Sequence, residues 1–96
     1  MDHSRFDWDD ANISHIAEHG VTPEQAEYAL DNDPYDLGFE IRKGEERLSH
    51  IGQTADGSIL VLITTERASK TRVITAFPAN HRQKIVFINT RRKTQQ

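Results

Sequence analysis

Five consecutive apolar residues, 59–63, constrain the fold of this chain more than any other stretch. A strand with one solvated face alternates apolar and polar residues, so an unbroken apolar run predicts a strand that is buried on both faces inside a sheet. The run before it, residues 47–53, leads into a turn containing Asp56-Gly57, a dipeptide typical of hairpins. The run after it, residues 72–77, is rich in β-branched side chains. We therefore predict an antiparallel meander at the centre of the fold.

A fourth strand is predicted just before this meander. Residues 35–42 alternate apolar and polar side chains, which is typical of a strand with one buried face. The turn at residues 43–46 places this strand beside residues 47–53, so the two are expected to form a hairpin. A short strand is also predicted at residues 5–8, with Phe6 and Trp8 pointing inward.

Two helices are predicted between the short strand and the meander. Asp9-Asp10 suits the start of the first helix, because acids favour a helix N-terminus, and Gly20 suits its end. The second helix has Thr22 as N-cap, Pro23 in the first turn and Gln25 as the partner in a capping box. We expect its end at residues 31–34. The predicted inward-facing residues are Ile13, Ile16 and Ala17 in the first helix and Ala26, Ala29 and Leu30 in the second.

The end of the chain is less regular. Asn80 and Gln83 form a potential capping box, which predicts a final helix, whereas residues 85–88 are β-branched enough to form a strand instead. Residues 91–96 are polar and basic, so a flexible tail is expected there. Helices in one block and strands in another predict a single α+β domain over residues 1–96, with helices on one face of the sheet.

The composition limits where the protein is expected to work and which side-chain chemistry it can use. The chain has no cysteine, which excludes disulfides and thiol chemistry. No apolar run approaches the length needed to cross a bilayer, and the N-terminus lacks the pattern of a signal peptide. A cytoplasmic protein with no membrane association is therefore expected.

The charge is distributed unevenly along the chain. Residues 1–67 hold all fifteen acids and five of the Lys and Arg residues, whereas residues 68–96 hold seven Lys and Arg and no acid. The cationic part could attract a phosphate backbone or an acidic protein. It could equally pack beside the acidic part of the same chain.

No familiar cofactor or nucleophile motif occurs in the sequence, and no cofactor is predicted. Phosphate-binding glycine loops, paired cysteines and a nucleophile elbow are all missing. His15 and His19 have the spacing of two metal ligands on one helical face, but the sequence offers no third ligand beside them. Surface or capping histidines are the simpler interpretation, so no metal site is predicted.

Polar residues on the strand ends and near the last helix could instead cleave RNA without a metal. That reaction needs a base for the 2′-hydroxyl, cations for the phosphate and an acid for the leaving oxygen. Arginine is well shaped for phosphate, and Glu66 or a histidine could move protons. The alternative is ordinary solvated charge and cross-strand ion pairing. The predicted catalytic residues are Glu66, Arg72 and His81, and the predicted substrate-binding residues are Arg47, Arg67, Arg82 and Lys84.

An ordered series of short motifs resembles the BrnT family of toxins from type II toxin–antitoxin systems. The series covers roughly residues 5–84, and its order is more specific than any single motif. It consists of Trp8-Asp9-x-x-Asn12, His19-Gly20-Val21, Gly44-Glu45-Glu46-Arg47, Ile51-Gly52, Thr65-Glu66-Arg67 and Arg72-Val73-Ile74-Thr75-Ala76.

The resemblance implies a RelE-like fold and a small ribonuclease that inhibits translation. Its implied partners are mRNA, free or on the ribosome, and a DNA-binding antitoxin encoded beside it. Either a homodimer or a toxin–antitoxin heterotetramer is compatible with this interpretation. By position, Arg47, Glu66, Arg67 and Arg72 fall in the sheet and turn motifs, and Arg82 and Lys84 in the final basic segment.

Two positions depart from the family pattern. Glu18 stands where the family often has a basic residue, just before His-Gly-Val. Phe77 follows Ala76, where the family usually has an arginine that can face the active site. A non-catalytic protein- or nucleic-acid-binding module with the same fold is therefore the alternative hypothesis.

Overall fold

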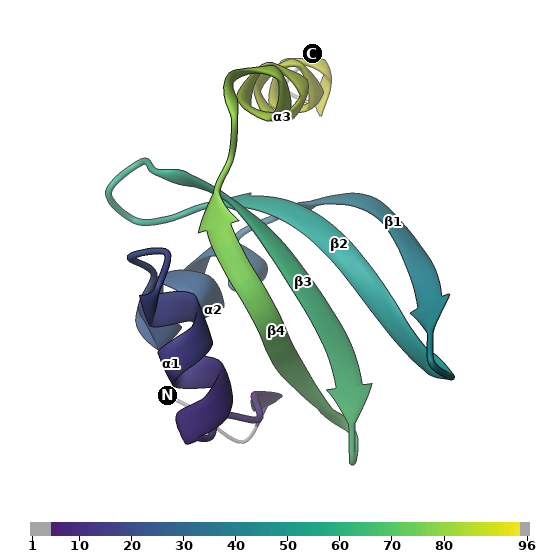
Figure 1. Ribbon diagram of the computed structural model, residues 1–96. Helices are drawn as coiled ribbons and strands as arrows, with labels where there is room; N and C mark the ends of the chain where they lie inside the picture. The colour runs from purple at the N-terminus through teal and green to yellow at the C-terminus, as the bar shows by residue number, and fades with distance from the viewer. Residues whose placement is uncertain (1–4, 95–96) are drawn as a thin grey trace.

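The computed structural model describes residues 5–94 and contains a four-stranded antiparallel sheet with three helices (Figure 1). The strands lie in the order β1-β2-β3-β4, so each is paired with its neighbour in sequence. This arrangement confirms the α+β prediction and the meander. The elements are α1 (Asp10–Ala17), α2 (Pro23–Asp31), β1 (Tyr35–Arg42), β2 (Glu45–Gln53), β3 (Ile59–Arg67), β4 (Lys70–Pro78) and α3 (His81–Thr94).

The predicted N-terminal strand is not formed. Phe6 makes only an isolated parallel bridge to Thr71 of β4. Phe6 is buried, as predicted, whereas Trp8 is only half-buried. Four residues with one bridge are too short a segment to extend the sheet.

Strand β3 is internal, as its apolar run predicts. Leu60, Val61 and Leu62 are buried, although they point alternately to the two faces of the sheet. Leu60 and Leu62 pack in the cluster formed with α1 and α2, and Val61 packs in the cluster formed with α3. Burial of both faces explains why residues 59–63 of this strand include no polar side chain.

Helix α2 lies directly on the sheet and packs closely against β2. A Cβ atom added to Gly52 would lie 2.7 Å from the carbonyl oxygen of Ala29 and 2.9 Å from its Cβ. Only glycine therefore allows this distance between helix and strand. Ala26 and Ala29 are buried and Leu30 is half-buried, which confirms the predicted inner face of α2.

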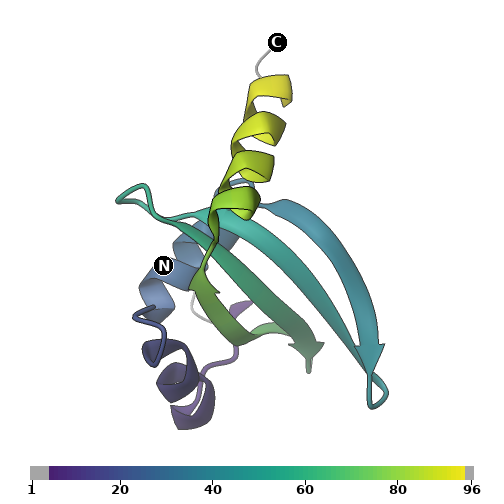
Figure 2. The same cartoon turned by 45° about the horizontal axis from the view of Figure 1, so that its top comes forward.

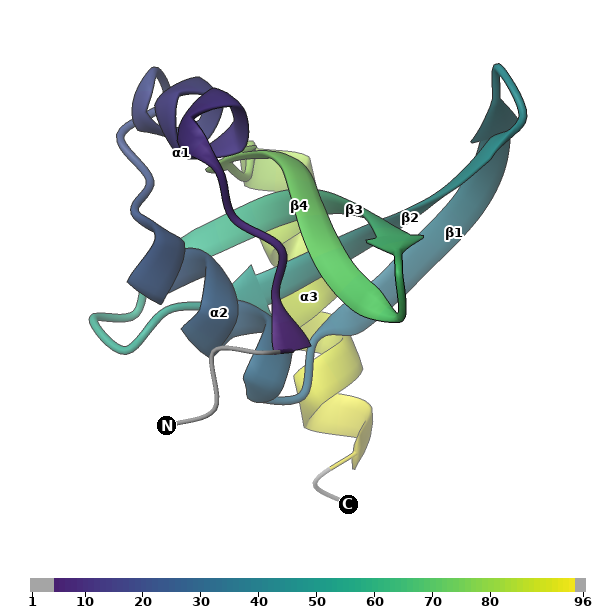
Figure 3. The ribbon, with the colours of Figure 1, turned by 90° about the horizontal axis from the view of Figure 1, so that it is seen from below.

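Helix α1 buries less than its sequence predicts. Ile16 is fully buried, but Ile13 is 37% exposed and Ala17 is also exposed, so the predicted stripe is wrong for these two residues. The helix has only eight residues and lies along the edge strand β4 rather than over the centre of the sheet (Figure 3). One row of its side chains therefore reaches the core.

Strand β1 has the predicted bounds and pairs with β2 as predicted, but it is not half-buried. All eight of its residues are exposed. Figure 3 shows that β1 swings away from α1 and α2, so neither helix covers it. The alternating pattern predicted a strand correctly, whereas burial depended on a covering layer that the chain does not supply.

Helix α3 packs on the opposite face of the sheet from α1 and α2, which differs from the prediction of one helical face (Figures 2 and 3). Phe87 is buried there against Ile51 and Val61, because these strand residues need an apolar cover. The Asn80–Gln83 capping box forms, with both hydrogen bonds at 2.8 Å. Residues 85–88 are consequently helical and not a strand.

The helix continues through Thr94, so the first part of the predicted basic tail is helical, and residues 95–96 lie outside the described residues. Within residues 5–94 no helix has the length and apolar character required to cross a membrane.

Candidate active site

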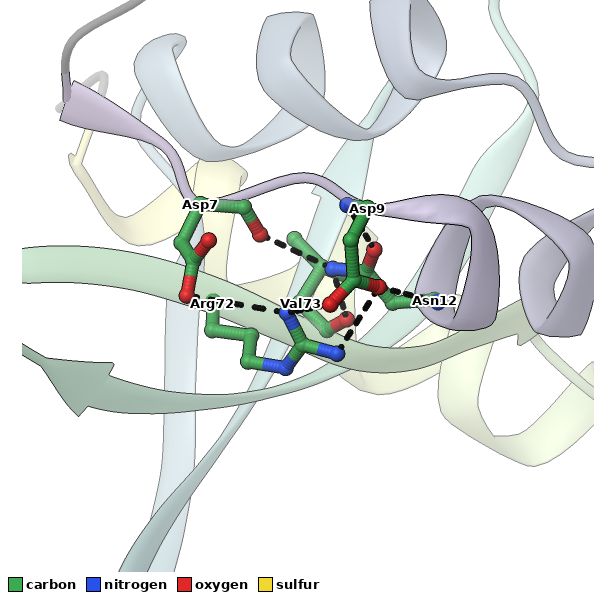
Figure 4. A network of polar contacts seen from close by, with 5 residues as sticks. All are labelled: Asp7, Asp9, Asn12, Arg72 and Val73. Atoms are coloured by element: carbon green, nitrogen blue, oxygen red, sulfur yellow. Dashed lines mark hydrogen bonds and ion pairs between the residues drawn. The ribbon is translucent and has the colours of Figure 1, made fainter.

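Arg72, at the start of β4, is held by two acids that precede α1 (Figure 4). Its Nη2 donates a hydrogen bond to Oδ1 of Asp9 at 3.1 Å, and its Nη1 lies 3.1 Å from Asp9 Oδ2. A second ion pair joins Nη1 to Asp7 Oδ2 at 3.6 Å. The Arg72 side chain is only 12% exposed, so most of its surface is covered by these contacts and its neighbours.

Asn12 connects the same acids to the sheet. Its backbone N–H donates to Asp9 Oδ1, and its side chain accepts from the Asp9 N–H, which completes a capping box at the start of α1. Its Nδ2 also donates to the backbone carbonyls of Asp7, at 2.9 Å, and Val73, at 3.2 Å. The Trp8-Asp9-x-x-Asn12 motif thus fixes α1 to β4 (Figure 4).

These contacts shift two pKa values in opposite directions. The hydrogen bond from Arg72 is the main cause that lowers the pKa of Asp9 below its usual 3.8, with help from the Asn12 backbone N–H. The same hydrogen bond raises the pKa of Arg72. Both groups are therefore ionised at neutral pH, and the pair is favoured in its charged form.

A cleft of about 290 Å³ lies beside this network. It is bounded by α1 and by the start of β2, the end of β3 and the start of β4. Arg47, Arg67 and Arg72 meet in its wall, together with one imidazole from α1. Glu45 is the only acid in the lining. The full set of lining residues is Ala11, Asn12, His15, Glu45, Arg47, Thr65, Arg67, Arg72 and Ile74.

The three arginines of the cleft are not equally available. Arg47 Nε donates to Glu45 Oε1 at 3.1 Å, and Arg72 is held by Asp7 and Asp9. Arg67 is exposed and makes no ion pair with any residue of the described part. Arg67 is thus the cation best placed to meet an incoming anion, with Arg47 beside it.

Alternation along β3 decides which predicted residues share this cleft. Thr65 and Arg67 point to one face, so Glu66, between them, points to the other. Glu66 accordingly lines two neighbouring hollows and does not line the cationic cleft. The structure therefore does not place this carboxylate beside the arginines.

His81, Arg82 and Lys84 lie on the first turns of α3 and are exposed. They do not line the cleft. Helix α3 covers the end of the sheet where Ile51, Val61 and Phe77 lie, whereas the cleft lies toward the opposite ends of these strands. The predicted site residues therefore fall into separate groups, of which only Arg47, Arg67 and Arg72 come together.

Phe77 has a structural role in this chain. It is half-buried beside the α3 cluster, and its ring centroid lies 6.0 Å from that of His19. His19 in turn contacts His15, with ring centroids also 6.0 Å apart. Among residues 5–94, no group of three or more potential metal-ligating side chains gathers here or elsewhere.

His15 is the cleft residue that sequence reasoning did not select for RNA chemistry. The i, i+4 spacing with His19 drew attention to metal binding instead. The useful signal was its position three residues after Asn12, because that spacing puts both side chains on the same face of α1. His15 is the only imidazole among the cleft-lining residues.

Two other polar features lie outside the cleft. A larger cavity of about 490 Å³ lies between α2 and the β2–β3 loop, and its lining includes Glu24, Glu27, Asp31 and Asp56. The negative charge of these four carboxylates repels phosphate. On the face opposite the cleft, His50 contacts Asp36 through Nδ1 at 2.8 Å and Thr64 through Nε2 at 2.9 Å. Thr64 is buried, so this triad joins three strands and exposes no nucleophile.

Comparison with known protein families identifies the family of this chain. No curated protein matches it. The sequence model of the family described as "Ribonuclease toxin, BrnT, of type II toxin-antitoxin system" matches residues 8–83. The match includes α1, α2, the whole sheet and all three arginines of the cleft. This chain therefore belongs to the BrnT family of ribonuclease toxins.

Proposed function

We propose that the chain is a metal-independent endoribonuclease that cleaves mRNA, arrests translation and is neutralised by a cognate DNA-binding antitoxin. The observation that carries this proposal is the meeting of Arg47, Arg67 and Arg72 with His15 in one cleft of a BrnT-family domain. A cationic cleft suits a phosphodiester backbone, because arginine can donate two hydrogen bonds to one phosphate.

The cleavage step assigns a role to each kind of group. A base removes the proton of a ribose 2′-hydroxyl, and the 2′-oxygen attacks the adjacent phosphorus. The bond from phosphorus to the 5′-oxygen then breaks, and that oxygen takes up a proton. The products are a 2′,3′-cyclic phosphate and a 5′-hydroxyl end. Such chemistry consists of proton transfer and charge stabilisation.

Within this scheme, Arg67 and Arg47 hold the scissile phosphate. His15 handles protons, because its side chain lines the same cleft and imidazole is the commonest general acid–base group in enzymes. Glu66 and His81 are weaker candidates for this role since they lie outside the cleft. Arg72 supports the wall of the cleft and reaches phosphate only if a phosphate oxygen replaces a carboxylate oxygen of Asp7 or Asp9.

Two observations favour the non-catalytic binding module as a second candidate. Arg72 is already neutralised within the chain by Asp7 and Asp9, and Phe77 stands where the family usually has an arginine. The cleft then has two arginines for an anion and one of these is paired with Glu45. Such a surface could bind RNA or the antitoxin without cleaving RNA.

Induction of the chain alone distinguishes the two candidates. Growth and bulk protein synthesis are measured for the wild type, for Arg47→Ala/Arg67→Ala and for His15→Gln. Arg92→Ala is the matched control, because Arg92 is an exposed cation on α3, away from the cleft. The nuclease proposal predicts arrest by the wild type and the control only, together with RNA ends that carry a cyclic phosphate.

Other results would contradict the nuclease. Full growth at high soluble expression of the wild type, with no antitoxin present, would exclude the nuclease and support the non-catalytic binding module. Arrest that persists unchanged in Arg47→Ala/Arg67→Ala removes the cationic cleft from the mechanism. Circular dichroism and a thermal melt of each variant establish that the fold is intact in these comparisons.

A further inference from the structure

The outer edge of β1 is unpaired, and the strand carries exposed apolar side chains. Strand β1 pairs with β2 on one side only, and nothing in residues 5–94 pairs with its other side. Phe39 is 66% exposed and Ile41 is 69% exposed, the highest values among the large apolar side chains described. An exposed apolar edge strand is a template for another strand, and native proteins normally protect such edges.

The opposite edge of the sheet shows that protection. Phe6 forms a bridge with Thr71 of β4, and the backbone N–H of Asp7 donates to the Thr71 carbonyl at 2.9 Å. Helix α1 packs beside β4 as well (Figure 3). The N-terminal segment and α1 thus protect the β4 edge, whereas no described residue protects the β1 edge. Only the β1 edge is therefore available to pair with another strand.

The turn between β1 and β2 shows which backbone groups face this open edge. Lys43 and Gly44 have φ values of 53° and 79°, and Arg42 opposes Glu45, which together define a two-residue hairpin turn of the primed type. In such a hairpin the pair that flanks the turn exchanges both hydrogen bonds, and the pattern alternates along the strands. The N–H and C=O groups of Ile41 and Phe39 consequently point outward, toward the open edge.

We propose that β1 pairs antiparallel with β1 of a second copy of this chain, around a two-fold axis at Ile41. Ile41 then opposes Ile41 of the second copy and exchanges both backbone hydrogen bonds with it. Glu40 opposes Arg42 of the second copy, and Arg42 opposes its Glu40. The two sheets join into one continuous sheet, an isologous contact of the kind that closes a dimer.

Charge complementarity carries the choice of partner and register. Within one chain Glu45 already opposes Arg42, and Arg47 opposes Glu40. In the proposed dimer, Arg42 also faces Glu40 of the second copy. Four charged side chains then lie in a row across the two sheets, with alternating sign: Glu45 and Arg42 of one chain, then Glu40 and Arg47 of the other. The other axis that the outward-pointing groups allow, at Phe39, would place Glu40 opposite Gly38 and Arg42 opposite the irregular segment between Asp36 and Gly38, so both Glu40–Arg42 pairs would be lost.

The dimer also relates the two cationic clefts. A two-fold axis perpendicular to the sheet leaves both clefts on the same face, since each face maps onto itself. Arg47, which lines the cleft, lies in the charged row that crosses the joint. If the proposed RNA cleavage holds, the joined face presents two cationic clefts to one RNA strand, although dimerisation itself does not depend on that function.

Sedimentation velocity over a broad concentration series tests the proposal on the full chain. The wild type should pass from monomer to dimer, whereas Glu40→Arg alone and Arg42→Glu alone should each remain monomeric through repulsion across the axis. An equimolar mixture of these two variants should restore the dimer, because each then meets opposite charges. Glu24→Arg, at an exposed position on α2, is the control that should dimerise like the wild type.

Three outcomes overturn the proposal. The wild type could remain monomeric at every concentration, dimerise unaffected by both single variants, or fail to recover a dimer in the mixture. Monomeric wild type whose antitoxin binding is lost in Ile41→Asp would assign the edge to the antitoxin instead. RNA cleavage by the same samples is measured separately, so failure of the dimer and failure of the nuclease are distinguishable.

Discussion

Arg72 of β4 and Asp9 before α1 form a two-point contact, with Nη2 to Oδ1 and Nη1 to Oδ2 each at 3.1 Å. Sixty-three positions separate the two residues in the sequence. Asp9 is also the N-cap of α1, so one carboxylate both caps the start of the helix and binds the sheet. Arg72, which its chemistry and the BrnT-like motifs predict as a catalytic residue, thus also has a structural task, and substitutions can separate that task from RNA binding.

Removal of the Asp9 charge should weaken the acid dependence of stability. Asparagine is as good an N-cap as aspartate, so Asp9→Asn keeps the cap and removes the ion pair. Because Arg72 lowers the pKa of Asp9 in the folded state, its contribution is present above the unfolded value near 3.8 and is lost as pH falls through the lower folded value. The wild type should therefore exceed the variant in urea midpoint at pH 7, and the difference should shrink below about pH 4.

Asp10→Asn is the matched control for this acid titration. Asp10 is exposed in the first turn of α1 and makes no ion pair with a residue of the described range. An Asp9→Asn difference that stays constant from neutral to acid pH would show that the ion pair contributes nothing to folding.

Asn12→Ala should destabilise the domain by about 2 kcal/mol, because it removes buried hydrogen bonds and leaves a strand carbonyl without its donor. Asn12 is 3% exposed and donates to the carbonyls of Asp7 and Val73. Urea unfolding followed by circular dichroism measures the change. Ser14→Ala, at an exposed position of the same helix, should have little effect, and equal stability of both variants would contradict the role given to Asn12.

The local sequence patterns predicted most of the fold for identifiable reasons. Turn and cap chemistry acts over a few residues, so the Asp56-Gly57 hairpin turn and the capping boxes at Thr22 and Asn80 were readable directly. Periodicity likewise gave the bounds of β1. Burial was predicted less well, because it depends on which distant element covers a strand: nothing described covers Phe39, and α3 covers Val61.

The sequence indicated only part of the cleft, because side-chain contacts between distant elements depend on how these elements pack. Arg47, Arg67 and Arg72 could be selected as cations near strand ends, and alternation along β3 could have separated Glu66 from Arg67. The contact of Arg72 with Asp7 and Asp9 was not readable, because no local rule links residues so far apart in sequence. His15 reaches the cleft only through the docking of α1 on β4.

Gly52→Ala should destabilise the domain by about 1–3 kcal/mol through overpacking. The new Cβ would lie 2.7 Å from the Ala29 carbonyl oxygen, and a helix backbone cannot move aside as a flexible side chain can. A thermal melt should show a lower midpoint for this variant than for Ser49→Ala, a small substitution on the same strand. An unchanged midpoint would mean that α2 can shift away from β2 at no cost.

Arg67→Ala and Arg72→Ala should differ in the property that they change. Arg67 is exposed and without an ion pair among described residues, so Arg67→Ala should lower affinity for a short single-stranded RNA and leave the urea midpoint unchanged. Loss of one phosphate contact should also reduce the salt dependence of binding, by a slope of about 0.7 on a log–log plot. Arg72→Ala should lower the urea midpoint, because Asp7 and Asp9 lose their partner.

Combining each substitution with loss of the acid separates support from direct contact. If Arg72 acts mainly through Asp9, then Arg72→Ala should cost less stability in an Asp9→Asn background than in the wild type, since the shared contact is already gone. Arg67→Ala should have the same effect on RNA affinity in both backgrounds, which makes it the matched control. Equal stability losses for Arg72→Ala in the two backgrounds would mean that the Asp9 contact does not stabilise the fold, and a strong salt-dependent loss of RNA affinity would then assign Arg72 to the phosphate directly.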